Sequence, residues 1–187
     1  MSLEKFRNKY RIPSARAQWW DYGSNAPYFV TICTKNREHY FGEIVNGKIQ
    51  LSEMGEIAQS EWQKTKELRP DMDLLLGEFI VMPNHFHCIV YIGDNPYNHI
   101  PCRDAMHCVS TITMYKNRFG AQSKNLSSII RGFKIAVTTY ARKHNMDFAW
   151  QPRFHDRIIR NENEHKRIVN YIINNPENWG NDKLNSL

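Results

Sequence analysis

Two histidines separated by one residue are the part of this sequence whose spacing points most directly to chemistry. His85 and His87 flank Phe86 in the apolar run HFHCIVYI at 85–92, which is typical of a β-strand. Because side chains alternate between the two faces of a strand, both imidazoles should lie on one face. Neutral imidazole is a good ligand for Mn²⁺-class and Zn²⁺-class ions, so the pair is a candidate metal site. Alone, such a pair is more often two half-buried histidines than a site.

A tyrosine and an asparagine near the end of the chain could complete that site. Tyr171 and Asn175 are four residues apart on a segment with helical spacing, so they should share one helix face. Packed on the histidines, this face would offer an amide oxygen to the ion and a phenol as nucleophile toward a phosphate. The alternative is that Tyr171 is a half-buried packing tyrosine, which helix spacing alone favours.

The elements that must position these residues can be predicted from periodicity, capping residues and turn residues. We expect strands at 28–34, 72–82, 85–92 and 154–159, a hairpin turning at Asn46-Gly47, and helices at 52–68, at 126–143 and from Asn161 onward. Ser52, Asn125 and Asn161 are the expected helix N-caps. This order predicts an α+β protein with a ferredoxin-like antiparallel sheet and helices packed on one face.

The chain divides into a basic N-terminal arm at 1–24, a single domain at 25–180 and a C-terminal tail at 181–187. The periodic pattern fails at 93–124, which we interpret as an insertion or loop without an assigned role. This insertion contains Cys102 and Cys108, but the spacing of its histidines and cysteines matches no standard zinc module.

The formal net charge of +6 favours a polyanionic partner, although a basic soluble surface explains the charge equally well. Basic residues of the arm and of the 126–143 helix are the candidate DNA contacts: Lys5, Arg7, Lys9, Arg11, Arg131, Lys134, Arg142 and Lys143. Cys33 and Cys88 lie in strand-like apolar runs and should be buried free thiols, which favours a cytoplasmic setting. No run approaches the ~18 apolar residues that a membrane helix needs.

Three motifs resemble those of one known family. The run VMPNHFHCIV at 81–90 resembles the His-hydrophobic-His motif of HUH single-tyrosine transposases, WQPRFHDRIIRN at 150–161 resembles their second signature, and VNYIINNP at 169–176 resembles their tyrosine segment. REP-associated tyrosine transposases are the most similar subgroup. The likeness covers roughly 25–92 and 124–180, with the motifs in the family's order.

The resemblance implies a reaction and roles for individual residues. In this family the histidines bind Mg²⁺ or Mn²⁺, and the tyrosine attacks single-stranded or hairpin DNA, leaving a 5′-phosphotyrosine and a free 3′-OH. By position, His85 and His87 match the metal pair, Tyr171 the nucleophile and Asn175 the third ligand. The third ligand is Gln in part of the family. Family members act in cis or in trans, and a homodimer is an expectation.

Three other functions remain as alternatives. A histidine-triad nucleotide hydrolase needs a third histidine where Ile89 stands. A non-catalytic DNA-binding protein derived from a transposase would retain the fold without cleaving DNA. A structural zinc protein would use Cys102 and Cys108.

Overall fold

The structure is a computed structural model that describes residues 17, 20–98 and 123–185. The predicted contacts Lys5, Arg7, Lys9 and Arg11, and the cysteines of the zinc alternative, Cys102 and Cys108, lie outside these residues. Within the described ranges, no helix combines the length and apolarity that crossing a membrane requires.

A four-stranded antiparallel sheet forms the centre of the molecule. Its strands are β1 (Ala26–Cys33), β4 (Leu74–Met82), β5 (His85–Ile92) and β6 (His155–Ile158), in the spatial order β4-β5-β1-β6. With one helix between β1 and β4 and another between β5 and β6, the connectivity is the ferredoxin-like split βαβ arrangement. The predicted α+β class and sheet are therefore confirmed.

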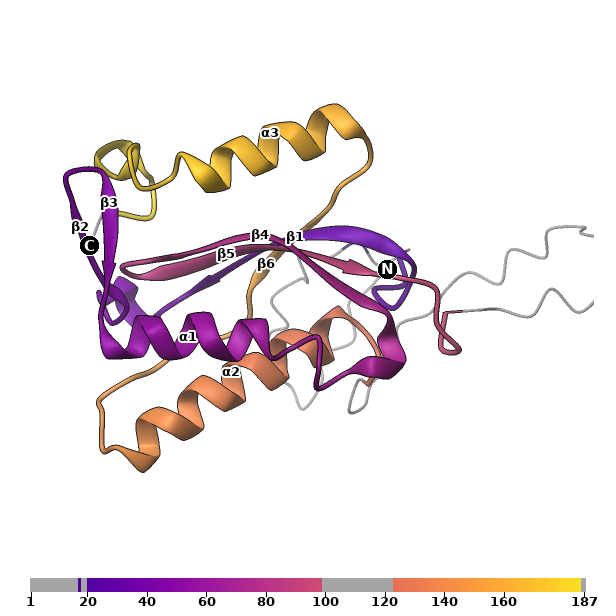
Figure 1. Ribbon diagram of the computed structural model, residues 1–187, viewed down its shortest axis with the longest axis horizontal. Helices are drawn as coiled ribbons and strands as arrows, with labels where there is room; N and C mark the ends of the chain where they lie inside the picture. The colour runs from indigo at the N-terminus through magenta and orange to yellow at the C-terminus, as the bar shows by residue number, and fades with distance from the viewer. Residues whose placement is uncertain (1–16, 18–19, 99–122, 186–187) are drawn as a thin grey trace, which may run out of the picture.

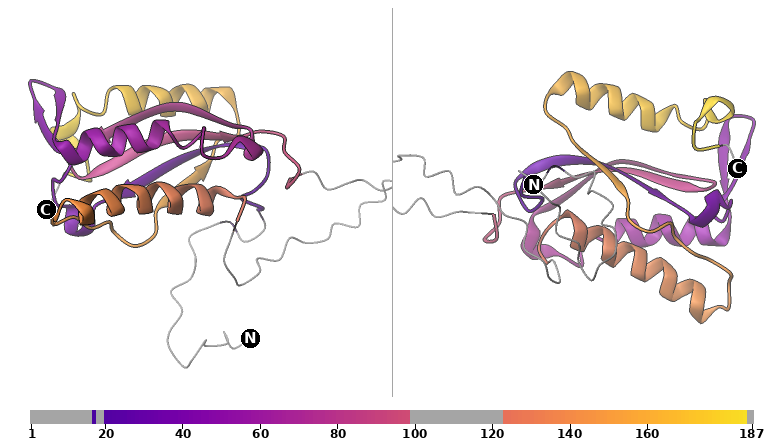
Figure 2. Two further views of the ribbon diagram at one scale, coloured as in Figure 1. Left: turned by 60° about the horizontal axis from the view of Figure 1, so that its bottom comes forward. Right: turned by 180° about the vertical axis from the view of Figure 1, so that it is seen from behind.

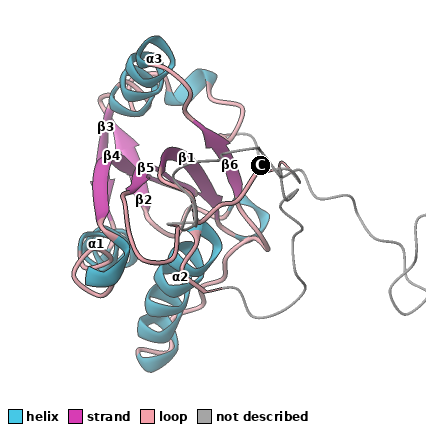
Figure 3. Cartoon of the chain, turned by 90° about the vertical axis from the view of Figure 1, so that its right-hand side faces the viewer, coloured by secondary structure: helices cyan, strands magenta, loops and turns pink. Residues whose placement is uncertain are grey.

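Helices cover both faces of this sheet, whereas the sequence predicted one covered face. Helices α1 (Glu53–Gln63) and α2 (Leu126–Lys143) lie on one side, and α3 (Glu162–Ile173) lies on the other (Figures 1 and 3). The reason is that β5 is apolar on both faces. Phe86 packs against Trp62 of α1 and Phe133 of α2, while Ile89, on the opposite face of the strand, packs with Ile168 and Ile172 of α3.

Each helix begins at its predicted N-cap. The side chains of Ser52, Asn125 and Asn161 accept hydrogen bonds from the backbone N–H groups of Gly55, Ser128 and Glu164 at 3.2, 3.0 and 2.9 Å. These bonds satisfy N–H groups that the first helical turn leaves without partners. Three short 3-10 helices also occur in the described chain: η2 (Lys35–Arg37), η3 (Pro70–Met72) and η4 (Trp179–Asn181).

The predicted hairpin is confirmed and stands at one end of the sheet. It pairs β2 (Gly42–Val45) with β3 (Lys48–Leu51), and Asn46 and Gly47 between them have φ values of 51° and 73°. A Cβ added to Gly47 would lie 3.6 Å from Cγ of Glu177. The hairpin tip therefore borders the chain that follows α3, as the rear view in Figure 2 illustrates.

The helix carrying Tyr171 ends earlier than the sequence predicted. Asn175 lies beyond Ile173, in a turn, and its backbone N–H donates to the carbonyl of Ile172 at 3.3 Å, a tight i→i−3 bond. Pro176 explains this boundary because the residue before a proline disfavours the helical region. From there the chain turns back across the histidine end of β5 through η4.

Candidate metal centre and active site

The two histidines share one face of β5 and are almost completely buried. His85 and His87 are 0% and 2% exposed, and their ring centroids lie 4.4 Å apart. The face toward which they point is that of α3, because Phe86 between them points into the core beneath α1 and α2. The predicted common face is therefore present.

A neighbouring asparagine determines which nitrogen of His85 carries the proton. Asn84 Nδ2 donates to the backbone carbonyl of Leu184 at 2.8 Å, so its Oδ1, 2.8 Å from His85 Nδ1, acts as the acceptor. Nδ1 of His85 consequently carries the proton and Nε2 presents a lone pair. Burial, with a smaller contribution from Arg37, lowers the pKa of His85 to about 3, so the ring is neutral near pH 7.

His87 is oriented from two sides. Its Nδ1 lies 2.9 Å from the hydroxyl of Thr31, the residue opposite it on β1, and its Nε2 lies 3.1 Å from the hydroxyl of Tyr171. Burial, and then the proximity of His85, lower the pKa of His87 well below its ordinary value. Both imidazoles are thus neutral, which is the form that binds metals.

Tyr171 reaches this centre from α3 while remaining open to solvent. Its side chain is 43% exposed, and its ring lies edge-on to Phe29 of β1. Burial and then the charge of Asp182 raise the pKa of Tyr171, and Asn175 acts in the opposite direction. The tyrosine borders an open pocket of about 710 Å³ that His87 and Asn175 also line.

Two buried acceptor atoms at this centre have no donor. Asn175 is 2% exposed, and because its Nδ2 donates to Asp182 Oδ2 at 3.1 Å, its Oδ1 is the free end. Asn175 Oδ1 and His85 Nε2 are two of the three buried side-chain N and O atoms in the described chain without a hydrogen-bond partner. The side chain of Asn175 also acts to raise the pKa of His85, so the two side chains are neighbours. A cation would satisfy both acceptors, so the donor set fits a metal ion.

Asp182 is a further potential metal ligand, and the sequence reasoning missed it. One ligand atom from each of His85, His87 and Asp182 lies within 4.8 Å of the other two. The aspartate belongs to the segment predicted as a C-terminal tail, where no periodicity or spacing relates it to the histidines. Only the fold of the chain after Pro176 brings it to the site.

The predicted basic residues of α2 lie on the opposite face of the sheet. Arg131, Lys134 and Arg142 line a second groove of about 480 Å³ between α2 and the 150–154 segment. Lys134 donates to the carbonyls of Gln151 and Arg153 at 2.7 and 3.0 Å. Burial lowers its pKa to about 8, so Lys134 has a packing role in addition to any contact with DNA. Lys143 is the last residue of α2.

Other cations stand closer to the histidines. Arg167 and Lys183 line the pocket that contains Tyr171, together with His155 of the second signature motif. The sequence reasoning did not select them because it followed the basic face of the longer helix. Arg167 precedes Tyr171 by four residues on α3, so the same helical spacing that paired Tyr171 with Asn175 could have identified it.

Comparison with known proteins places the chain beside one curated relative and a transposase fold. No family model matches the sequence. The chain is 35% identical over 172 residues to an uncharacterized protein of Haemophilus influenzae, covering 91% of both chains. Its structure resembles that of a REP-associated tyrosine transposase bound to a REP hairpin, with a TM-score of 0.56 and 19% identity over 92% of this chain and 77% of the other. A candidate transposase of Deinococcus radiodurans aligns with a TM-score of only 0.38 at 16% identity, over 88% of this chain and 97% of that one.

Proposed function

The chain belongs to the same family as the Haemophilus influenzae protein, and we propose that it is a metal-dependent transposase-type endonuclease that cleaves and rejoins single-stranded or hairpin DNA through Tyr171. The observation that carries this proposal is the hydroxyl of the partly exposed Tyr171, which lies 3.1 Å from Nε2 of His87 in the buried histidine pair, with two unsatisfied acceptors beside it. The solved structure of similar fold is a transposase with a DNA hairpin, which supports the choice of substrate.

The chemistry follows from the groups at the pocket. The phenol of Tyr171 gives its proton to solvent water in the open pocket, and its oxygen attacks a DNA phosphorus atom. The new O–P bond joins the 5′ phosphate to the tyrosine, the P–O3′ bond breaks, and the 3′ oxygen takes a proton from water to become a free hydroxyl. A 3′ hydroxyl of the same or another strand can reverse these steps, because the phosphotyrosine retains the energy of the broken ester.

His85 Nε2, His87 Nε2 and Asn175 Oδ1 would hold the ion, which we propose to be Mg²⁺ or Mn²⁺. When bound, a divalent ion supplies Lewis-acid polarisation of the phosphate. The protein's own contributions are the neutral, oriented imidazoles and the rigid attachment of Tyr171 to α3. Arg167 and Lys183 on the pocket rim are placed to hold adjacent phosphates.

The test is a cleavage assay on single-stranded DNA taken from the flanks of the chain's own gene. With Mn²⁺ or Mg²⁺, the wild type should form an adduct that survives denaturing electrophoresis and carries the label of the 5′-phosphate fragment. Tyr171→Phe keeps the ring and should form none, while it still binds the DNA.

Tyr140→Phe is the matched control. Tyr140 is on α2, and its hydroxyl donates a hydrogen bond to Glu53 at 2.8 Å. Helix α2 covers the face of the sheet opposite the one that carries the histidines. This variant should retain the adduct. An adduct that persists in Tyr171→Phe, or one attached through a 3′ phosphate, would refute the mechanism. DNA binding without any adduct from the wild type would indicate the non-catalytic alternative.

A further inference from the structure

The chain beyond α3 folds back over the histidine pair and brings one carboxylate to it. We infer that Asp182 is a metal ligand, which makes the segment at 176–185 part of the metal centre. This inference rests on the metal site of the proposed function and assigns that site a negatively charged ligand that the motifs did not identify.

The geometry leaves Asp182 able to coordinate an ion. Its ligand atom lies within 4.8 Å of those of both His85 and His87. Each of its oxygens accepts one hydrogen bond from the protein: Oδ2 from Asn175 at 3.1 Å and Oδ1 from the backbone N–H of Leu184 at 2.8 Å. A carboxylate oxygen has two lone-pair positions, so each oxygen retains one for a metal.

The negative charge of Asp182 is what the other three ligands of the site lack. The two imidazoles and the amide of Asn175 are neutral, so a site built from them alone would leave a divalent charge in a mostly buried place without compensation. Asp182 is the one carboxylate in the metal-ligand group that the described residues form. Carboxylate and carbonyl oxygens also shift the metal preference of a site toward Mg²⁺ and Mn²⁺, relative to a site made only of imidazoles.

The position of the segment is fixed by several contacts with the site. Asn84 donates to the carbonyl of Leu184, and Arg37 Nη1 donates to the same carbonyl at 3.3 Å. The ring of Trp179 lies 5.9 Å from that of His85. Because Asn84 also holds His85 Nδ1, one side chain orients a histidine ligand and anchors the segment that carries Asp182. Asn84 is therefore a positioning residue for both.

The experiment is a titration of the full-length, metal-free protein with Mn²⁺ in the absence of DNA, followed by calorimetry or by the electron paramagnetic resonance signal of the free ion. Asp182→Asn preserves the shape of the side chain and removes its charge. Its Mn²⁺ affinity should fall at least about tenfold, in the range seen for removing groups around a metal site. Asp182→Glu restores the charge and should recover part of the affinity.

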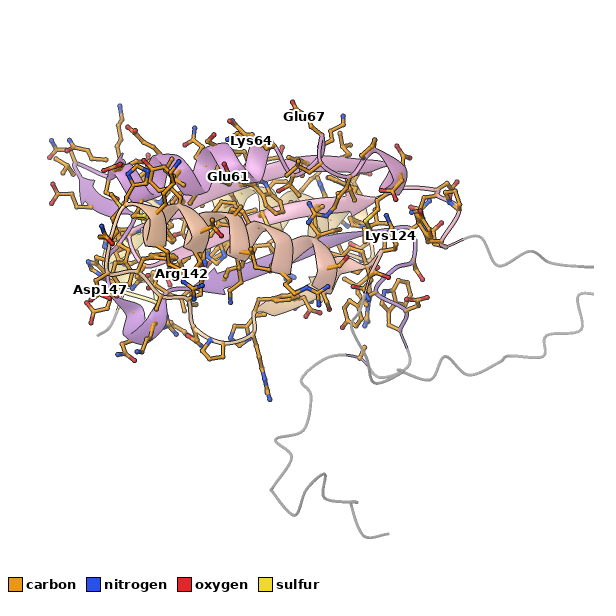
Figure 4. The ribbon with its side chains drawn as sticks, turned by 90° about the horizontal axis from the view of Figure 1, so that it is seen from below. Glu61, Lys64, Glu67, Lys124, Arg142 and Asp147 are labelled. Atoms are coloured by element: carbon orange, nitrogen blue, oxygen red, sulfur yellow. The ribbon has the colours of Figure 1, made fainter. Side chains whose placement is uncertain are left out.

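Asp147→Asn is the matched control, because Asp147 follows the C-terminal end of α2, on the side of the sheet opposite α3 (Figure 4). It should bind Mn²⁺ like the wild type, and thermal unfolding should confirm that all variants are folded. A wild type that binds Mn²⁺ together with an Asp182→Asn protein of equal affinity would overturn the role of Asp182 alone. A wild type that binds no Mn²⁺ would overturn the metal site as a whole, while the adduct assay on Tyr171 reports on cleavage independently.

Discussion

At the scale of single residues, this site depends on side chains that hold the histidines rather than on the histidines alone. Asn84 fixes the tautomer of His85, and Thr31 contacts Nδ1 of His87 from the adjacent strand. Both imidazoles are therefore oriented before any ion arrives, and their low pKa values keep them unprotonated. Mutation of such outer contacts typically lowers metal affinity about 10- to 100-fold.

The hydroxyl of Thr31 offers a clean test of this arrangement. Thr31→Val replaces it by a methyl group of similar size and leaves His87 Nδ1 without its 2.9 Å partner. We expect Mn²⁺ affinity to fall about 10- to 100-fold and the free energy of unfolding to decrease by roughly 1–3 kcal/mol.

Thr138→Val is the control for this substitution. Thr138 on α2 donates to the carbonyl of Lys134 at 2.7 Å, a local helix contact away from the site. Its Mn²⁺ affinity should equal that of the wild type in the same titration. If Thr31→Val also binds Mn²⁺ as tightly as the wild type, the threonine contributes to packing only.

The sequence could identify some of these residues and not others. His85 and His87 follow from strict alternation in a strand, and Tyr171 from its place in a motif on a helix. Asp182 is separated from Tyr171 by Pro176 and a 3-10 helix, so neither periodicity could relate the two. Contacts between distant segments, such as Asn84 with Leu184, arise only from the tertiary fold.

At the scale of elements, α3 determines where Tyr171, the proposed nucleophile, is placed. Its first turn is tied to the preceding loop through Glu164, which accepts from the backbone N–H of Arg160 at 3.0 Å and from Arg157. The sequence predicted the cap at Asn161 correctly, because capping is a local interaction. The sequence prediction placed the end of the helix too late, because Pro176 disfavours the helical conformation of Asn175, the residue before it.

The carboxylate of Glu164 makes the stability of this helix start depend on pH. The hydrogen bond from Arg160, and then that from Arg157, lower the pKa of Glu164 in the folded protein, and burial opposes them. A lowered pKa means that the stabilisation is complete above the unfolded value of about 4.3 and disappears as the pH falls through the folded value. Thermal unfolding measured from pH 7 to pH 3 should therefore include a loss from Glu164 at the acid end.

Glu164→Gln should remove that contribution. At pH 7 the variant should melt roughly 3–8 °C below the wild type, because it loses hydrogen bonds to a charged acceptor. Toward pH 3 the two melting temperatures should converge. Glu162→Gln, at a side chain 77% exposed, should cost little at pH 7 since solvent screens its ion pair with Lys166. A constant difference between wild type and Glu164→Gln at every pH would contradict the linkage.

At the scale of the whole molecule, the sheet separates two surfaces with different charged groups. The α3 face carries the pocket with Tyr171, and the α2 face carries the groove lined by Arg131 and Arg142. Helical periodicity predicts where a helix forms, but it does not specify which side of a sheet the helix covers. For that reason the division of helices between the two faces could not be predicted, although the sheet and its order of elements could.

The net charge of +6 and these two surfaces lead to a prediction about salt. If DNA phosphates contact the α2 groove, affinity for a DNA hairpin should fall steeply between 50 and 200 mM salt, about 10³-fold or more when six or more phosphates are neutralised. The double variant Arg131→Ala/Arg142→Ala should then bind more weakly, and the slope of log affinity against log salt should decrease by about 0.7–0.9 for each phosphate that is no longer neutralised. Lys134 is left unchanged because its ammonium also supports two backbone carbonyls.

The control for this prediction removes the same number of positive charges from the turn that follows α1. Lys64 pairs with Glu61 at 2.7 Å, and Glu67 lies on the same side of the molecule (Figure 4). Lys66 is exposed in the turn that follows α1. Lys64→Ala/Lys66→Ala therefore removes two cations from a surface that also carries carboxylates. This variant should keep the affinity and the salt slope of the wild type, because a neutralised patch releases few counterions from DNA. Equal slopes for all three proteins would mean that DNA does not use the α2 groove. A slope reduced in both variants would mean that net charge alone governs the interaction, since only a localised contact distinguishes Arg131 and Arg142 from Lys64 and Lys66.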